Sequence, residues 1–110
     1  MNRKAICLTA IMIAGFVCAV VTPAIACDDG ATMFKAKCAM CHGQDATGKT
    51  PMGSKLNIPD LTSAAVQKQS DAEITGVITK GRNKMPEYGS KLTKDQIAEL
   101  GKYIRSVAKK

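Results

Sequence analysis

The 110-residue sequence predicts an all-α protein. Apolar residues recur at helical spacing in its second half, and capping boxes precede two of these segments. No segment alternates apolar and polar residues as a strand does, and we expect three to five helices. The chain has two Phe, two Tyr and no Trp, which supplies few large side chains for a small domain. Something other than side chains is therefore expected to fill the centre of the fold.

Residues 1–26 have the pattern of a secretory signal peptide. Arg3 and Lys4 precede an uncharged run from 5 to 22, which is followed by a proline and small residues. Cleavage after this segment leaves a mature domain of 84 residues, 27–110, exported to the periplasm. The uncharged run is close to the length of about 18 residues that spans a bilayer, so an uncleaved anchor is the alternative.

The first residue of this mature chain is a cysteine. The stretch Ala24-Ile25-Ala26-Cys27 resembles the bacterial lipobox, whose cysteine is acylated, although that motif usually has Leu where this chain has Ala24. Acylated Cys27 would associate the protein with the membrane. A soluble form with a free or blocked thiol is the alternative, and both give the same mature polypeptide.

Three segments are expected in the first half of the mature chain. Asp29 is a candidate N-cap for a helix over about 30–41. Residues 42–57 are rich in Gly, Thr, Lys and Pro and lack an apolar period, which predicts a loop. A short helix is expected to begin at Asp60 and to end before the polar residues 67–69.

The next helix is marked more strongly. Ser70 and Glu73 form a capping box ahead of apolar residues at positions i, i+3 and i+4, and Gly81 fits the position just after the helix. Residues 82–91 contain Pro and Gly without an apolar period, which predicts a second loop.

The last helix carries the strongest signals. Thr93 and Gln96 form a second capping box, and the helix is expected to reach about Ala108. Gly101 lies inside it at a cost of about 1 kcal/mol relative to Ala. Either that cost is tolerated, or the missing side chain lets this helix cross another closely, near Gly30. The predicted buried stripe consists of Ile97, Leu100, Ile104 and Val107.

One motif carries recognisable chemistry. Cys38-Ala39-Met40-Cys41-His42 is C-x-x-C-H, the signature of covalent c-type haem attachment. Two thiols at this spacing on a helix end can reach both vinyl groups at one porphyrin edge, and the adjacent imidazole then points at the iron. A zinc site, a redox-active dithiol and a disulfide are the alternatives. A closed zinc site needs four ligands, and only the distant Cys27 would complete the set. A thioredoxin-like dithiol is expected near strands, which the sequence does not predict.

The mature chain resembles the small bacterial class I cytochromes c over residues 28–110. Gly30 and Phe34 precede the first cysteine as in the first helix of that family, and Leu100 and the pair Tyr103-Ile104 match its last helix. The resemblance implies one covalently bound haem c, with the N-terminal and C-terminal helices crossing beside it.

The resemblance also implies the residues that hold this haem. Cys38 and Cys41 would form its thioether bonds, and His42 would be one axial ligand of the iron. Met85 is followed by proline, as is the second axial ligand of the family. Pro51 lies nine residues after His42, where short bacterial members have a proline whose carbonyl accepts the histidine ring N–H.

Met85 is also favoured over the other methionines of the mature chain. Met40 lies between the two cysteines and cannot reach the opposite face of a porphyrin, and Met33 lies upstream on the same helix. Met52 follows His42 too closely to pass around the ring without strain. Met85 stands in an irregular loop after a capped helix.

Ligation by His and Met fills both axial positions of the iron and raises its reduction potential. The sequence therefore predicts a single-electron carrier rather than an enzyme. Two alternatives remain. One is a haem-based sensor or peroxidase in which Met85 is displaceable, and the other is a fixed electron-entry subunit of a membrane oxidoreductase.

Composition and charge bear on the partners. Hydrophobic residues make up 45% and charged residues 23% of the chain, which excludes a disordered tail, a collagen and a multi-span membrane protein. The mature chain has 14 basic and 9 acidic residues, a net charge of +5. We expect a monomer that docks on acidic patches of redox partner proteins. Nucleic acid is excluded because the chain is exported and lacks interleaved aromatic residues. The flanking basic residues expected to steer docking are Lys35, Lys37, Lys49, Lys55, Lys80, Arg82, Lys84 and Lys91.

Overall fold

The computed structural model of the chain describes residues 29–109. The predicted leader, residues 1–26, and Cys27 lie outside the described residues. Apart from one isolated bridge, the described part of the chain contains no strand, which confirms the all-α class. Its helices are α1 (Gly30–Lys37), α2 (Ala39–His42), α3 (Pro51–Leu56), α4 (Ala64–Gln67), α5 (Asp71–Lys80) and α6 (Lys94–Ser106).

The helix predicted over 30–41 is divided in two at Cys38, which is one reason why six helical segments replace the expected three to five. Asp29 caps α1 as predicted, since its carboxylate accepts the Thr32 N–H at 2.8 Å. Cys38 departs from ideal helical geometry, with φ −114° and ψ −31°. Its N–H still donates to the Phe34 carbonyl at 2.8 Å. The motif-bearing segment therefore continues from α1 with only a local kink.

The second reason is α3, which lies inside the segment 42–57 that was predicted to be a loop. That prediction is wrong because the same residue types that favour a loop also begin and end a short helix. The Thr50 hydroxyl accepts the Gly53 N–H at 2.8 Å, and Pro51 occupies the first helical turn. Asn57, with a left-handed φ of 52°, ends the helix.

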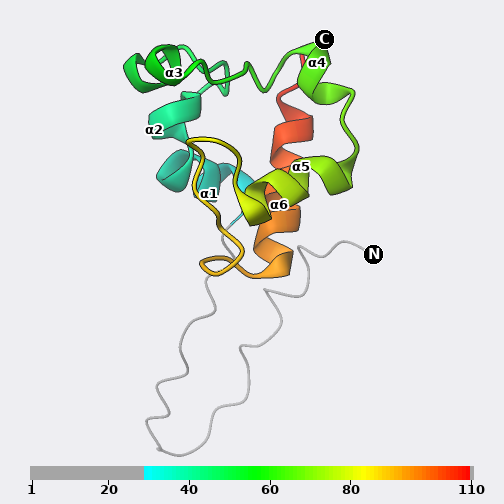
Figure 1. Cartoon of the computed structure of the whole chain (residues 1–110). Helices are drawn as coiled ribbons and strands as arrows, with labels where there is room; N and C mark the ends of the chain where they lie inside the picture. Colours follow the sequence, from blue (N-terminus) through cyan, green and yellow to red (C-terminus); the bar gives the residue numbers. More distant parts are fainter. Residues whose placement is uncertain (1–28, 110) are drawn as a thin grey trace, which may run out of the picture.

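The helix predicted from Asp60 begins later, at Ala64, with Ser63 as its N-cap. Asp60 instead closes the turn that precedes it, because its carboxylate accepts the Thr62 N–H at 2.8 Å. The same carboxylate accepts from the Lys109 ammonium at 2.9 Å, which holds the C-terminal end beside α4 (Figure 1). The hydrogen bond from the Thr62 hydroxyl is the main reason that the pKa of Asp60 falls to about 2.

Replacing Asp60 with Asn is expected to lower the free energy of unfolding near neutral pH by about 1 kcal/mol, the usual net worth of a hydrogen bond. The folded-state pKa of Asp60 lies below its unfolded value, so its stabilising effect is complete above about pH 4 and disappears as the pH falls towards about 2. Urea unfolding of the wild type and of Asp60→Asn at about pH 7, 4 and 2.5 measures how the difference between their free energies of unfolding decreases with pH. A difference that is the same at all three pH values would contradict the prediction.

The predictions for α5 and α6 are confirmed. Both capping boxes are present, with the Glu73 carboxylate accepting the Ser70 N–H at 2.6 Å and the Gln96 carbonyl accepting the Thr93 N–H at 2.8 Å. Gly81 follows α5 with a φ of 72°. Of the predicted stripe on α6, Ile97, Leu100 and Ile104 are buried and Val107 packs against them.

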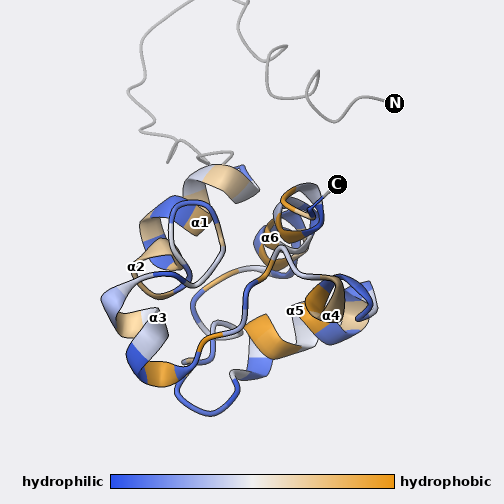
Figure 2. Cartoon of the chain, turned by 90° about the horizontal axis from the view of Figure 1, so that it is seen from above, coloured by the Kyte–Doolittle hydropathy of each residue, from blue (hydrophilic) through white to orange (hydrophobic). Residues whose placement is uncertain are grey.

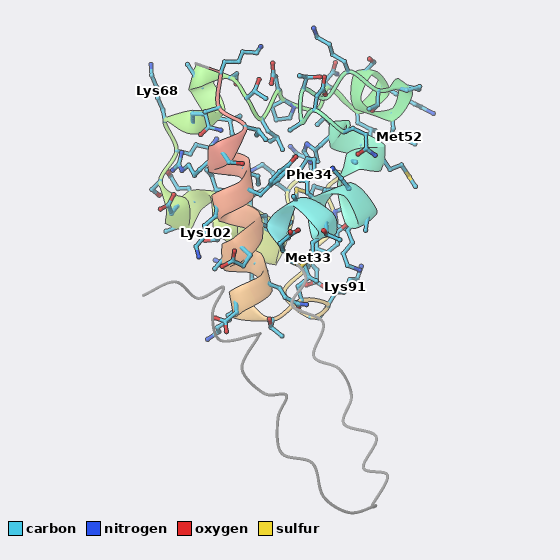
Figure 3. All side chains as sticks on the ribbon, turned by 180° about the vertical axis from the view of Figure 1, so that it is seen from behind. Met33, Phe34, Met52, Lys68, Lys91 and Lys102 are labelled. Atoms are coloured by element: carbon cyan, nitrogen blue, oxygen red, sulfur yellow. The ribbon has the colours of Figure 1, made fainter. Side chains whose placement is uncertain are left out.

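The crossing of the first and last helices is confirmed and forms the centre of the core (Figures 1 and 3). A Cβ at Gly30 would lie 2.2 Å from the Glu99 carbonyl oxygen, so the two backbones approach at a distance that only glycine permits. Further along, the rings of Phe34 and Tyr103 lie with centroids 5.0 Å apart. Phe34 and Leu100 are each 1% exposed.

Of the two alternatives for Gly101, close approach to another helix is supported, but that helix is α5 and not α1 at Gly30. A Cβ at Gly101 would lie 3.0 Å from the Thr75 methyl group of α5. The reason is helical geometry, because a position two residues from Glu99 and Tyr103 points to the other side of α6. Gly101 therefore eases the contact between α5 and α6.

Arg105 fastens the connection between α4 and α5 to the last helix. Its guanidinium donates to the backbone carbonyls of Gln67 and Gln69, and to the Asp71 carboxylate at 2.8 Å. The Gln67 amide in turn donates to the Ile104 carbonyl at 2.9 Å. This network joins α4, the start of α5 and the short connection between them to α6.

Viewed from above, α1, α2 and α3 lie on one side of the molecule and α4, α5 and α6 on the other (Figure 2). The longest helix between residues 29 and 109 is α6, with 13 residues. None of the helices in this range combines the length and the apolar character needed to cross a bilayer. The space between the two groups of helices holds the candidate site.

Candidate functional site

A cavity of about 230 Å³ lies between the two groups of helices, and each of the six helices contributes to its lining. Cys38, Cys41, His42 and Met85 all line it, so the structure brings four of the five predicted site residues together. The remainder of its wall is mostly apolar. The apolar lining residues are Phe34, Leu56, Ile58, Pro59, Leu61, Val66, Ile74, Val77, Ile78, Pro86, Leu100 and Ile104.

The two cysteines of the motif lie at the end of the α1–α2 segment, one helical turn apart. Both are half-buried and neither forms a disulfide. Burial raises the pKa of the Cys38 thiol to about 11. A thiol with a raised pKa is a poor nucleophile for thiol–disulfide exchange, so this environment does not favour a redox-active dithiol. It does present two sulfur atoms to the cavity from one edge.

His42 is the last residue of α2, and its ring lies at the cavity wall. Burial lowers the pKa of His42, which favours the neutral imidazole with one nitrogen free to bind a metal. The Nδ1 atom is buried and has no hydrogen-bond partner among the described residues. A ring nitrogen left in this state is typical of a ligand whose surroundings are completed by a bound group.

Pro51 is the one predicted site residue that the structure does not bring to the cavity. It begins α3, where its carbonyl is directed along the helix axis. The hydrogen bond expected between this carbonyl and the His42 ring is absent, because Nδ1 is without a partner.

Met85 reaches the cavity from the loop between α5 and α6. It is half-buried and packs against the core. The other described methionines are placed elsewhere, with Met33 2% exposed in the core and Met40 81% and Met52 41% exposed. Figure 3 shows Met52, a residue of α3, at the outer edge of the molecule and away from the centre. Met85 is therefore the only methionine in residues 29–109 that lines the cavity.

The chemistry of these donors separates the alternatives raised by the motif. No group of three or more His, Cys, Asp or Glu residues within 29–109 is placed to hold a metal ion, and Cys27, which a four-ligand zinc site would need, lies outside this range. Two free thiols, one imidazole and one thioether around a mainly apolar cavity fit a covalently attached haem. The residues present therefore fit that group.

Two features of the site were missed in the sequence. The Tyr88 hydroxyl donates to the Lys37 carbonyl at 3.3 Å, which links the Met85 loop to the end of α1. Gly53 of α3 leaves room for the motif, since a Cβ there would lie 2.8 Å from the Cys41 carbonyl oxygen. Neither contact has a local signal, because in each case the partner is remote in the sequence or belongs to a helix that was not predicted.

The known proteins that this chain resembles are c-type cytochromes and subunits of cbb3-type cytochrome c oxidases. A profile of the family described as "Cytochrome C oxidase, cbb3-type, subunit III" matches residues 26–104. The chain is 31% identical to a cytochrome c6 of Nostoc sp., with 93% of this chain and 91% of that protein covered. It is 35% identical to the cbb3-type cytochrome c oxidase subunit CcoP of Cereibacter sphaeroides, with 72% of this chain but 27% of that protein covered. The chain thus spans about a quarter of the length of that relative. Among solved structures, the c-type cytochrome KustC0563 matches with a TM-score of 0.69 and 30% identity, covering 74% of this chain and 100% of that one.

Proposed function

Because this chain belongs to the cytochrome c family, we propose that it is an electron-transfer protein that carries single electrons between redox partners through one haem c. Cys38 and Cys41 supply the sulfur atoms of the thioether bonds. His42 and Met85 supply the two axial ligands. When bound, the haem exchanges one electron between its ferric and ferrous states.

The observation that carries this proposal is the meeting of four residues at one cavity. Cys38, Cys41 and His42 arrive together on α1 and α2, whereas Met85 comes from a loop more than 40 residues later in the chain. Two axial ligands of one iron must border the same cavity, and His42 and Met85 do so. With His42 and Met85 both committed as ligands, the site has no open position for a substrate, which favours electron transfer.

The surface around the cavity supports docking on an acidic partner. All eight flanking basic residues are exposed, and none of them takes part in the ion pairs found within residues 29–109. Lys37, Arg82 and Lys84 also line the cavity. Positive charge at the opening of the site would orient an acidic partner towards the redox centre.

The rate of electron transfer from the reduced protein to an acidic redox protein is expected to fall as ionic strength rises. Exposed charges separated by more than about 8 Å are largely screened at physiological salt, so steering weakens as salt is added. Stopped-flow measurements of the second-order rate constant over a range of NaCl concentrations test this. The double variant Lys37→Gln, Lys84→Gln should show a weaker salt dependence, with Lys68→Gln and Lys94→Gln as the matched control. A rate constant that does not change with salt would exclude electrostatic docking.

A periplasmic location follows from the predicted leader and agrees with this function. The match to CcoP favours a second candidate function, in which the domain is a fixed electron-entry part of a membrane oxidase. Acylated Cys27 would then hold it at the membrane. Mass spectrometry of the N-terminus of the native protein tests this anchor, because a diacylated Cys27 supports membrane attachment and an unmodified terminus contradicts it.

A further inference from the structure

The loop that carries Met85 turns back on itself directly after α5. The Arg82 N–H donates to the Met85 carbonyl at 3.2 Å, and the Met85 N–H donates to the Arg82 carbonyl at 2.9 Å. Asn83, the first of the two residues between them, has a left-handed φ of 54° and is exposed. The backbone of Met85 is therefore fixed by two hydrogen bonds before its side chain reaches the cavity.

Gly81 lies on the inside of this turn. It has a φ of 72°, and a Cβ there would lie 2.6 Å from the Met85 carbonyl oxygen. The same Cβ would lie 3.0 Å from the Glu87 nitrogen and 3.0 Å from the Pro86 carbonyl carbon. All three neighbours are backbone atoms, which cannot rotate out of the way as a flexible side chain can. A side chain at Gly81 must therefore move the Met85–Pro86 backbone.

The other end of the loop is also hydrogen-bonded to α5, so it cannot shift easily when the Met85–Pro86 backbone moves. The Tyr88 N–H donates to the Ile78 carbonyl at 3.0 Å, and the Gly89 N–H donates to the Thr79 carbonyl at 3.0 Å. Both acceptors belong to the last turns of α5, the helix that ends just before Gly81. Residues 81–89 are thus held at both ends by the same helix, and Met85 lies between the two attachments.

We propose that Gly81 is a positioning residue for the second axial ligand, because its lack of a side chain lets the loop fold closely enough on α5 for Met85 to reach the iron. This inference rests on the proposed function, in which Met85 is that ligand. Gly81 itself does not line the cavity.

Titration of the oxidised, haem-loaded full chain with imidazole tests the inference. Added imidazole competes with Met85, so its apparent affinity rises with the fraction of molecules in which Met85 is not bound. We expect Gly81→Ala to bind imidazole at least about tenfold more tightly than the wild type, approaching the affinity of Met85→Ala. Absorption spectroscopy follows the binding. A wild-type affinity in Gly81→Ala, with tight binding in Met85→Ala, would overturn the inference and leave the proposed function intact.

The outcomes of the two proposals are distinguishable. If Met85→Ala itself binds imidazole no better than the wild type, Met85 is not a ligand and both proposals fail. Gly101→Ala is the matched control, because a Cβ there would lie 3.0 Å from the Thr75 methyl group, a tight contact with α5 that lies outside the loop 81–89. It should keep nearly wild-type imidazole affinity, and an equal gain in affinity would refute a specific role for Gly81.

A second variant covers the case in which Gly81→Ala does not fold. Asn83→Val places a β-branched residue at a left-handed φ in this turn, at an exposed position that also borders the cavity. It should raise imidazole affinity in the same direction, by a smaller factor. An unchanged affinity in this variant would count against control of Met85 by the turn.

Discussion

Replacing Met85 with alanine is expected to lower the reduction potential of the protein and to let carbon monoxide bind to the reduced form. The thioether of methionine stabilises the ferrous state relative to nitrogen or water ligands. Axial ligands set the potentials of haem proteins over a range of about 0.8 V, and we expect a fall on the order of 0.1 V. Spectroelectrochemical titration measures the potential, and absorption spectra under carbon monoxide report the open position.

Met52→Ala is the matched control for this experiment. Met52 is the same residue type in the same domain, but it is 41% exposed and does not line the cavity. Its removal should leave both the potential and the carbon monoxide response unchanged. A Met85→Ala protein with the potential and spectrum of the wild type would show that the second ligand lies elsewhere. Rapid binding of carbon monoxide by the wild type at neutral pH would instead favour the sensor or peroxidase alternative.

Replacing Gly30 with alanine is expected to reduce the free energy of unfolding by about 3 kcal/mol, at the upper end of the usual effect of overpacking. The added Cβ would lie 2.2 Å from the Glu99 carbonyl oxygen and 2.8 Å from its carbonyl carbon. These are backbone atoms of α6, so α1 must move away from the helix that it crosses. The ring contact between Phe34 and Tyr103 lies in the same crossing and would be disturbed with it.

Gly76→Ala provides the matched control, because Gly76 lies inside α5 and a Cβ there meets nothing within 4 Å. The substitution should stabilise the protein by about 0.5–1 kcal/mol through the higher helix propensity of Ala. Denaturant unfolding of the haem-loaded proteins measures both changes. Similar stability in the two variants would contradict the close backbone approach at Gly30.

The parts of the fold that the sequence predicted correctly are those encoded by neighbouring residues. In α5 and α6 the capping boxes at Ser70 and Thr93 and the apolar spacing agree, so local signals alone place both helices. In α3 there is no apolar period to support the helix. Thr50 caps it and also donates from its hydroxyl to the Cys41 carbonyl at 2.9 Å, so part of its stability comes from tertiary contact. Such contact cannot be read from the residues of one segment.

The same distinction between local sequence signals and long-range contacts applies to the candidate site. Cys38, Cys41 and His42 are adjacent in the sequence, and their spacing alone indicates their chemistry. The wall opposite them depends on Arg105, which binds carbonyl groups of residues 36 and 38 positions earlier in the chain. Pro51, which the family resemblance places beside His42, begins α3 and does not line the cavity. Long-range contacts of this kind leave no pattern in a single sequence.

Haem staining of a denaturing gel, run with the full chain produced in a host that matures c-type cytochromes, tests the central claim most directly. Only a covalently attached haem stays with the polypeptide under these conditions. The wild type should stain, and the double variant Cys38→Ala, Cys41→Ala should not. A wild-type band without stain, or a double variant that stains as strongly as the wild type, would contradict attachment of one haem c through these two cysteines.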